Sequence, residues 1–342
     1  MSGLAARKHQ PLQVAVCGTG SWGTAFASLL ADNGAMVRMW GKFADEVAEI
    51  RQHHRSIRYL PDLELPETVS ATTDPFEALE GADIAVLAMP AQTLRANLLE
   101  WGSGLSGSVV VTSLIKGIEL GTTKRMSEVI TEAGGVPPER VCVISGPNLA
   151  TEIARREKAA TVVASGWPET AEKVAEACAT PYFRPYTSAD VIGCEVGGSV
   201  KNVIALAVGM AEGMGMGTNS KAAIMTRGLA EMQALGAALG ADPDTVNGLA
   251  GVGDLVTTCM SPLSRNQSFG RKLGTGRSVQ EVVADTQQTA EGVKSCGPIM
   301  ELARHHGVTM PIVELVVSVV QDGRAPADIR SELLTDGHTW TT

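Results

Sequence analysis

Lys201 is the residue in this chain whose type and position most strongly indicate chemistry. It lies in a stretch, residues 191–211, that contains one acid, one base and little else that is polar. If this stretch is helical, the side chains within reach of the ammonium belong to residues three and four positions away, which are Gly197, Gly198, Ile204 and Ala205. A helix that is apolar on nearly all sides is buried, and a lysine is rarely buried without a partner. Lys201 therefore needs a distant carboxylate or a ligand for its charge, which indicates an active site.

Other segments with chemical potential combine charge with glycine or other turn formers. Lys116 follows a predicted parallel strand at its carboxyl end, where open α/β sheets bind ligands. Asp254 stands between an apolar stretch and two threonines, and Arg265 follows Ser264 where a helix is predicted to begin, a position suited to binding phosphate. Ser145-Gly-Pro-Asn148 follows another strand and opens a helix, so we expect its backbone amides to face the same crevice.

The segment Gly18-Thr-Gly-Ser-Trp-Gly23 has the spacing of a dinucleotide-binding turn. Gly18 permits the tight turn, Gly20 lets a pyrophosphate approach the backbone, and Gly23 allows close packing of helix on strand. The helix that follows supplies unpaired N–H groups to the phosphates. Because the motif stands between a predicted strand and a predicted helix, we interpret it as a dinucleotide site; the alternative is a generic glycine turn.

The end of the second predicted strand distinguishes NAD from NADP. An acid there binds the ribose 2′-hydroxyl of NAD, whereas a base favours the 2′-phosphate of NADP. The chain has Lys42 at this point and no acid before Asp45. Lys42 favours NADP weakly, because a loop lysine is usually only a solvated charge, so NAD or NADP remains open.

The elements that would position these residues fall into two groups. From residue 12 to about residue 188, short β-branched runs alternate with amphipathic stretches, as in a doubly wound α/β domain. Strands are predicted at Leu12–Cys17, Met36–Trp40, Asp83–Met89, Ser108–Leu114, Val141–Ser145 and Ala160–Ser165, and helices at Trp22–Asn33, Asp45–His53, Ala91–Trp101 and Lys124–Ala133. Beyond residue 188 only helices are predicted, at Gly193–Met210, Asn219–Leu239, Ser278–Ala284, Ser295–His306 and Pro311–Asp322. The predicted fold is α/β, with a Rossmann-type dinucleotide-binding domain over residues 1–190 and an all-α substrate and catalytic domain over residues 191–342.

Composition excludes several other classes of protein. The 342 residues carry a net charge of −9 and are 44% hydrophobic, which is typical of a globular protein and argues against a general nucleic-acid binder. The six cysteines are scattered and are expected to be reduced, and the histidine pairs lack metal-ligand spacing, so no metal is expected. Residues 1–11 lack the apolar core of a signal peptide, and no segment has the uninterrupted apolar length of a membrane span. We therefore expect a cytoplasmic protein, and the glycine-rich helical domain favours a homodimer.

Several of these motifs together resemble one known family. They are the glycine turn with Trp22, Lys116-Gly117, Ser145-Gly146-Pro147, Gly198-x-x-Lys201-Asn202, Gly253-Asp254-Leu255, Ser264-Arg265-Asn266 and Glu291-Gly292. In this order they resemble NAD(P)-dependent sn-glycerol-3-phosphate dehydrogenase of the bacterial type, and they span most of the chain. The Lys-Asn and Arg-Asn pairs are far more specific than the glycine turn.

The resemblance implies a role for each matched residue. Lys201 would be the catalytic acid/base, Lys116 would reinforce its charge and Asp254 would orient the two lysines. The cofactor would contact Gly18, Gly20, Ser21, Trp22, Gly23, Lys42, Lys116, Ala150, Arg265 and Glu291. A small phosphorylated substrate would contact Lys116, Gly146, Asn148, Lys201, Asn202, Asp254, Ser264, Arg265 and Asn266. Two residues depart from the family pattern: Asn148 stands where Ser or Thr is usual, and Lys42 where Arg or His is frequent.

Two alternatives compete with this interpretation. A 3-hydroxyacid or 6-phosphogluconate-type dehydrogenase shares the two-domain layout, but those enzymes place the asparagine one helical turn after the lysine, whereas Asn202 is adjacent to Lys201. A protein that senses NAD(P)H without turnover would not need Lys201, Lys116 and Asp254 together. Each of these residues also has a structural interpretation, as a surface charge, a turn residue or a lysine at a helix edge.

Overall fold

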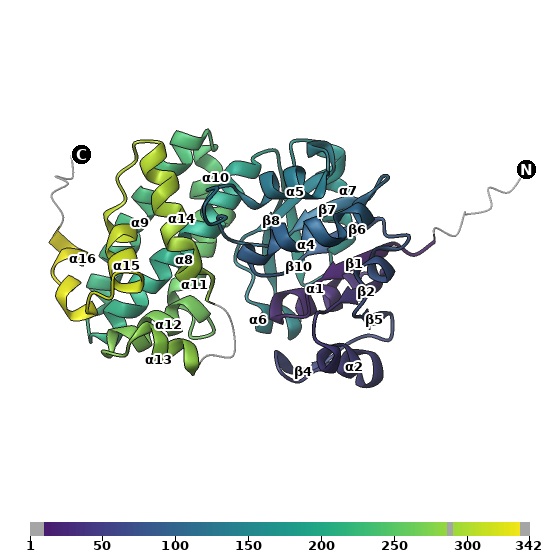
Figure 1. The fold of residues 1–342 in the computed structure, drawn as a ribbon, viewed down its shortest axis with the longest axis horizontal. Coiled ribbons are helices and arrows are strands. Elements are labelled where there is room, and N and C mark those ends of the chain that lie inside the picture. The colour runs from purple at the N-terminus through teal and green to yellow at the C-terminus, as the bar shows by residue number, and fades with distance from the viewer. Residues whose placement is uncertain (1–9, 286–289, 336–342) are drawn as a thin grey trace, which may run out of the picture.

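A computed structural model describes residues 10–285 and 290–335 and divides them into an α/β half and a helical half (Figure 1). The last strand of the α/β half ends at Ser188, and the first helix of the other half begins at Val191. The helical half has its own large apolar core, and the α/β half has a core on each face of its sheet. The predicted α/β fold followed by an all-α domain is therefore confirmed.

An eight-stranded sheet forms the centre of the α/β half, in the order β10-β9-β8-β7-β6-β1-β2-β5. All neighbouring strands pair in parallel except β8 and β9. The strands are β1 (Gln13–Cys17), β2 (Met36–Trp40), β5 (Val69–Thr72), β6 (Ile84–Leu87), β7 (Val110–Ser113), β8 (Val141–Ser145), β9 (Ala159–Ala164) and β10 (Phe183–Ser188). A separate hairpin pairs β3 (Arg55–Ser56) with β4 (Leu60–Glu64). All six predicted strands are present, each within a few residues of its predicted bounds.

Helices cover both faces of the sheet, as the doubly wound pattern predicts. One face packs against α1 (Ser21–Asp32), α2 (Ala44–His53), α6 (Ala150–Ala154) and α7 (Pro168–Cys178). The other face packs against α3 (Pro75–Leu79), α4 (Leu94–Trp101) and α5 (Met126–Gly134). Short 3-10 turns occupy Ala91–Thr93, Gly102–Leu105 and Pro138–Arg140. The polar elements β5, β10, α3 and α7 and the β3–β4 hairpin escaped the sequence-based prediction.

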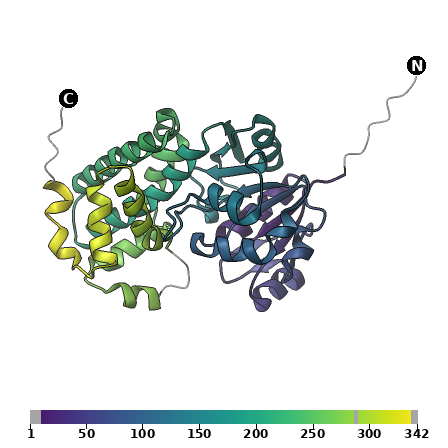
Figure 2. The same cartoon turned by 45° about the horizontal axis from the view of Figure 1, so that its top comes forward.

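The helical half, coloured from teal through green to yellow in Figure 2, is built around α8 (Val191–Gly213), which is buried from Gly193 to Ala211. The elements around it are α9 (Thr218–Leu239), α10 (Pro243–Asn247), a π-helix (Leu249–Gly253), α11 (Asp254–Met260), α12 (Arg265–Gly274), α13 (Val279–Ala284), α14 (Glu291–His305), α15 (Pro311–Val320), a 3-10 turn (Pro326–Ile329) and α16 (Glu332–Thr335). Each of the five predicted helices is present. Neither α10 nor α11 was predicted, because both are short and the segment between them contains Gly248, Gly251 and Gly253.

Glycines let α12 approach α8 closely enough to fix the functional residues of both helices. A Cβ atom on Gly209 of α8 would lie 2.2 Å from the carbonyl oxygen of Gln267, and one on Gly270 of α12 would lie 2.2 Å from that of Leu206. No other residue fits at these two positions. This contact brings the beginning of α12, with Arg265, beside Lys201 in the middle of α8.

The apolar character of α8 has a structural explanation. Within the described residues α8 alone is long and apolar enough to cross a membrane, but neighbouring helices bury 89% of its most apolar window. A core helix meets the same criteria of length and hydropathy. The six cysteines are free and buried, in agreement with the prediction of reduced thiols.

Candidate active site

A cleft of about 610 Å³ lies between the carboxyl edge of the sheet and the helical half. Most of the predicted site residues line it, although they come from segments as far apart in the chain as Gly18 and Glu291. They are Gly18, Gly20, Ser21, Trp22, Lys42, Lys116, Asn148, Ala150, Lys201, Asn202, Ser264, Arg265, Asn266 and Glu291. The remaining three, Gly23, Gly146 and Asp254, lie directly behind this wall. The structure therefore brings all the predicted residues together at one place.

Asp254 is the distant carboxylate that Lys201 requires. Its Oδ1 lies 2.9 Å from Lys201 Nζ, and its Oδ2 lies 2.5 Å from Lys116 Nζ. All three side chains are largely shielded from water, with 9% of Lys201, 14% of Lys116 and 2% of Asp254 exposed. One carboxylate thus binds two ammonium groups, which leaves a net positive charge at the wall of the cleft.

The remaining contacts of the two lysines fix their orientation. Lys201 Nζ donates a hydrogen bond of 2.7 Å to Thr258 Oγ1, and Thr258 Oγ1 donates in turn to Asp254 Oδ1 at 3.2 Å. Lys116 Nζ donates to the carbonyl oxygen of Gly146 at 2.9 Å. Lys201 therefore uses two of its three N–H groups within the protein. The third N–H is available to a ligand in the cleft.

Burial and charge adjust the proton affinity of this cluster. Burial lowers the pKa of Lys201 to about 8; the attraction of Asp254 opposes this, and the repulsion of Lys116 adds to it. Burial tends to raise the pKa of Asp254, but the two ammonium groups outweigh it and leave this pKa below its usual value. Asp254 is therefore ionised at neutral pH, and Lys201 loses its proton within the range useful for acid–base catalysis.

Local structure explains why Asp254 points at the lysines. The π-helix 249–253 leads directly into α11, so Asp254 stands in the first turn of a helix, where a carboxylate is favoured. Thr258 follows four residues later and shares its face of the helix. The role of Thr258 was not predicted, although its spacing of four residues from Asp254 is the signal that would have identified it.

An asparagine network joins α8, α12 and α14 at the floor of the cleft. Asn266 Nδ2 donates to Asn202 Oδ1 at 2.8 Å, and the backbone N–H of Gly292 donates to Asn266 Oδ1 at 2.9 Å. Asn202 Nδ2 donates to the carbonyl oxygen of Gly198 at 3.2 Å. Ser264 caps α12 by accepting from the backbone N–H of Gln267 at 3.2 Å. Asn202 thus serves as a structural partner of Asn266.

Arg265 projects from the first turn of α12 into the cleft, where it is exposed. Glu291 and Tyr59 lie close enough to interact with its charge. Arg265 therefore presents a guanidinium beside the lysine cluster, a group suited to binding phosphate or carboxylate.

The glycine turn has the geometry that an approaching pyrophosphate needs. Gly18 has a φ of +135°, and a Cβ there would lie 2.3 Å from the carbonyl oxygen of Ala88. A Cβ on Gly23 would lie 2.3 Å from the carbonyl oxygen of Gly18, whereas one on Gly20 would meet nothing within 4 Å. The first turn of α1 has no acidic residue and no side-chain cap, which favours an anion at this end of the helix. Gly20 is therefore kept open for a ligand, while Gly18 and Gly23 are required by the fold.

Unsatisfied polar atoms in the cleft also fit a dinucleotide. Among the described residues, Asn148 Oδ1, Glu291 Oε2 and Trp22 Nε1 are buried and have no hydrogen-bond partner. Buried polar atoms are normally paired, so these three indicate a ligand that has polar groups of its own. The residues present therefore fit a nicotinamide dinucleotide. No group of three potential metal ligands occurs within the described ranges.

Three residues near the predicted cofactor site were missed from the sequence. Glu46 accepts a hydrogen bond of 2.8 Å from Thr19 Oγ1 and one of 2.9 Å from Arg58 Nη1. All three line the cleft near Lys42, and Lys42 itself is exposed. Arg58 lies in the unpredicted β3–β4 hairpin, and nothing in its local sequence connects it to the glycine turn.

Both halves of this chain match models of one known protein family. The model of the NAD-dependent glycerol-3-phosphate dehydrogenase N-terminus matches residues 13–171, and that of the C-terminus matches residues 190–331. Glycerol-3-phosphate dehydrogenase (NAD(P)+) of Streptomyces griseus is 56% identical over 325 residues, which cover 95% of this chain and 97% of the relative. The Thermobifida fusca protein of the same name is 57% identical and covers 92% and 94%.

Solved structures agree with these matches. The crystal structure of glycerol-3-phosphate dehydrogenase from Coxiella burnetii superposes with a TM-score of 0.91 at 35% identity, and covers 95% of this chain and 99% of that one. A D-mandelate dehydrogenase in complex with NADH has a TM-score of 0.61 at 15% identity and covers 91% of this chain and 98% of that one, which shows a shared fold alone. Because both family models match in chain order and the relatives have nearly the same length, the chain belongs to the NAD-dependent glycerol-3-phosphate dehydrogenase family.

Proposed function

We propose that the protein interconverts dihydroxyacetone phosphate and sn-glycerol 3-phosphate, with NAD(P)H as the hydride carrier. The observation that carries this proposal is the buried Lys201 ammonium, whose pKa is lowered to about 8 and which faces a cleft lined by the glycine turn. The names of the relatives and the match of both halves to one family support the same reaction.

In the proposed mechanism Lys201 is the acid/base. When bound, the nicotinamide supplies a hydride to substrate C2 in reduction and accepts one in oxidation. Lys201 donates a proton to the C2 oxygen in reduction, with its free N–H aimed into the cleft, and receives it back in oxidation. Asp254 and Thr258 hold the ammonium in place during this transfer. Lys116 adds a second positive charge, which stabilises the negative charge that develops on the substrate oxygen.

The phosphate of the substrate would bind at the beginning of α12. Arg265 supplies a guanidinium there, and Ser264 and Asn266 flank it in the wall of the cleft. Gly146 and Asn148 would contact the other side of the substrate from the loop after β8. Binding energy from the phosphate then positions C2 close to Lys201.

The same cleft would hold the cofactor along the carboxyl edge of the sheet. The pyrophosphate would contact Gly18, Gly20, Ser21 and Trp22. Gly23 would support the turn. The nicotinamide half of the cofactor would contact Ala150, Arg265 and Glu291. Lys116 would lie close to both the cofactor and the substrate. Lys42 favours NADP, because it places a positive charge at the end of β2 where the 2′ position is read.

We also propose how the chain is organised and where it works. The division into residues 1–190 and 191–342 is supported by the change from strand to helix between Ser188 and Val191.

A homodimer is supported by apolar side chains that α11 leaves exposed, with Met260 73% exposed. A cytoplasmic location and a supply of glycerol 3-phosphate for phospholipid synthesis agree with the family.

A direct assay tests the proposed reaction. The absorbance of NADH or NADPH should fall when dihydroxyacetone phosphate is added to the protein, and glycerol 3-phosphate should form in equal amount. A hydroxyacid dehydrogenase would instead respond to 3-hydroxyacids or 6-phosphogluconate, and a non-catalytic sensor would bind NAD(P)H without oxidising it. Either of these results would refute the proposed reaction.

A further inference from the structure

Glu195 is a buried carboxylate that the proposed mechanism does not use. It is the one acid in the apolar stretch 191–211, and it lies on α8, the helix that also carries Lys201. Its Oε1 accepts a hydrogen bond of 2.8 Å from the backbone N–H of Ser127, and its Oε2 accepts from Ser127 Oγ at 2.6 Å and from Arg125 Nη1 at 2.8 Å. A carboxylate on the helical half is thus bound by donors that all come from the α/β half.

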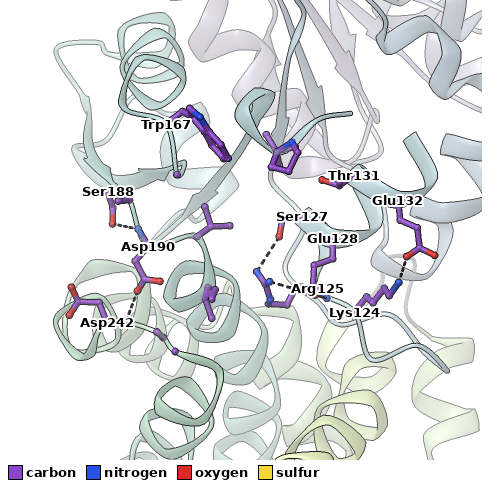
Figure 3. A pocket seen from close by; sticks show the side chains of 18 residues that line it. Lys124, Arg125, Ser127, Glu128, Thr131, Glu132, Trp167, Ser188, Asp190 and Asp242 are labelled. Atoms are coloured by element: carbon purple, nitrogen blue, oxygen red, sulfur yellow. Dashed lines mark hydrogen bonds and ion pairs between the residues drawn. The ribbon is translucent and has the colours of Figure 1, made fainter. Parts of the chain in front are cut away.

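Arg125 compensates the cost of burying this charge. Burial raises the pKa of Glu195, while Arg125 and Ser127 oppose that increase. Arg125 also caps α5 and contacts Glu128 at 3.2 Å. Its side chain also lines a surface groove between the two halves, where Arg125 lies beside Ser127 (Figure 3). The charges that line this groove, among them Lys124 and Asp190, already have protein partners, so the groove gives no sign of a ligand of its own.

Arg125 ends the loop that begins with Lys116. Within this 116–125 loop, Ile118 pairs with Arg125 as a β-bridge, and the backbone N–H of Glu119 donates to the carbonyl oxygen of Lys124 at 2.9 Å. The side chain of Ile118 is 1% exposed and packs into the core of the helical half rather than that of its own half. The loop therefore contacts the helical half through Lys116, Ile118 and Arg125, while residues 120–122 in its middle are exposed.

The residues of α8 that receive this loop share one stripe of the helix. Glu195, Gly198 and Asn202 are spaced three and four residues apart, so they lie above one another on the same face. A Cβ on Gly198 would lie 3.3 Å from Lys116 Cγ, and Asn202 Nδ2 lies 3.5 Å from the carbonyl oxygen of Lys116. Along this stripe Glu195 makes the charged contact, and the other two residues accommodate Lys116.

We propose that Glu195 is a positioning residue that fastens the 116–125 loop to α8 and thereby sets Lys116 against Asp254 in the active site. This inference rests on the proposed role of Lys116 in the reaction. Gln92 and Arg95 bind the middle of this loop to the α/β half. Without Glu195 the loop loses its charged contact with α8, and Lys116 would sample positions away from Asp254.

The test compares Glu195→Gln with Glu231→Gln. Glu231 is also buried in the helical half and accepts backbone N–H groups, from Ile312 at 2.6 Å and Val313 at 3.2 Å, but it faces α15 rather than the α/β half. We expect Glu195→Gln to lower kcat by about 10- to 100-fold, in keeping with the cost of a misplaced catalytic group, while the Kd for NADPH changes less than about twofold. Glu231→Gln should lose a similar amount of thermal stability but keep its kcat. A folded Glu195→Gln variant with the kcat of Glu231→Gln would overturn the proposal.

The pH profile separates positioning from a direct effect of the lost charge. Lys201 is faced by Asp254, Thr258 and Cys259 of α11 and by Lys116 of the loop. If Lys116 moves away, the repulsion that lowers the pKa of Lys201 is lost, and the fall of activity at alkaline pH shifts to higher pH. Removal of the Glu195 charge by itself would shift it to lower pH. A shift to lower pH, or none, would therefore contradict the positioning role.

Two further variants complete the test: one replaces Glu195→Gln if that variant does not fold, and one separates the inference from the proposed function. Should Glu195→Gln not fold, Ser127→Ala removes one donor and retains the ion pair, and we expect it to lower kcat several-fold in the same direction; an unchanged kcat would refute the inference. Lys116→Ala distinguishes the inference from the proposed function. If Lys116→Ala retains turnover, the role of Lys116 itself is wrong, whereas loss of turnover in Lys116→Ala but not in Glu195→Gln rejects only the positioning role.

Discussion

Lys201 Nζ lies 2.9 Å from Asp254 Oδ1, although 53 positions separate the two residues in the chain. The same carboxylate binds Lys116 through its other oxygen. One buried acid therefore neutralises one ammonium and leaves the second uncompensated. Burial is the main cause of the lowered pKa of Lys201, and the repulsion of Lys116 adds to it. The excess of positive charge gives the cleft its affinity for an oxyanion.

The pH dependence of activity should follow Lys201. In the reduction of dihydroxyacetone phosphate the protonated lysine is the active form, so kcat/KM should fall as the pH rises through the pKa of about 8. In the oxidation of glycerol 3-phosphate the neutral lysine is active, and kcat/KM should rise through the same pKa. Steady-state profiles in both directions check this. Profiles that move in the same direction would exclude Lys201 as the group that titrates.

Asp254 should matter for stability as well as for turnover. Asp254→Asn leaves two buried ammonium groups without their carboxylate, so we expect a loss of about 3–5 kcal/mol in the free energy of unfolding. Lys201→Met keeps the Lys116–Asp254 pair and removes one buried charge, so its stability at pH 7 should equal or exceed that of the wild type. Urea unfolding of both variants measures this. A Lys201→Met variant that is less stable than Asp254→Asn would contradict the charge arrangement.

Gly18 and Gly20 should respond differently to alanine. Gly20 has a φ of −69° and open space around its Cα, so Gly20→Ala should leave thermal stability nearly unchanged and weaken NADPH binding. Gly18→Ala places a methyl group 2.3 Å from a carbonyl oxygen at a φ of +135°, so it should destabilise the fold by more than about 1 kcal/mol. Calorimetry and fluorescence titration distinguish the two effects. Equal loss of stability would show that Gly20 is also required by the fold.

Lys42→Ala tests the choice of cofactor. Because Lys42 is exposed at the end of β2, its loss should not affect stability, but it should raise the KM for NADPH more than that for NADH. Cofactor competition kinetics on the wild type and the variant provide the measurement. Equal changes in both KM values, or a strong preference of the wild type for NAD, would remove the support for NADP.

Much of this site could be predicted from sequence because its residues lie next to strong local signals. The glycine turn follows a buried strand, and Lys201 stands out against an apolar helix. β10 was missed because it is an edge strand with Pro185 and exposed positions, which removes the apolar run that marks an internal strand. The antiparallel pairing of β8 and β9 leaves no trace in either strand, since both are short and apolar.

The partners within the site required the structure. Nothing local connects Asp254 with Lys116, because their contact depends on the packing of α11 against α8 and of the 116–125 loop on the same helix. The close approach of α12 to α8 likewise depends on glycines at matched positions of two helices, which no single periodic pattern reveals. Sequence reasoning identified the residues of the site, while tertiary packing decided which of them touch.

The most direct test of the role of Lys201 compares wild type and Lys201→Ala in the reduction of dihydroxyacetone phosphate, with the Kd for NADPH measured on the same samples. We predict that turnover falls by at least about 10³-fold, since both the proton donor and its charge are lost, while the Kd for NADPH stays within about twofold. Turnover close to that of the wild type in Lys201→Ala would contradict the account and return this lysine to a structural role.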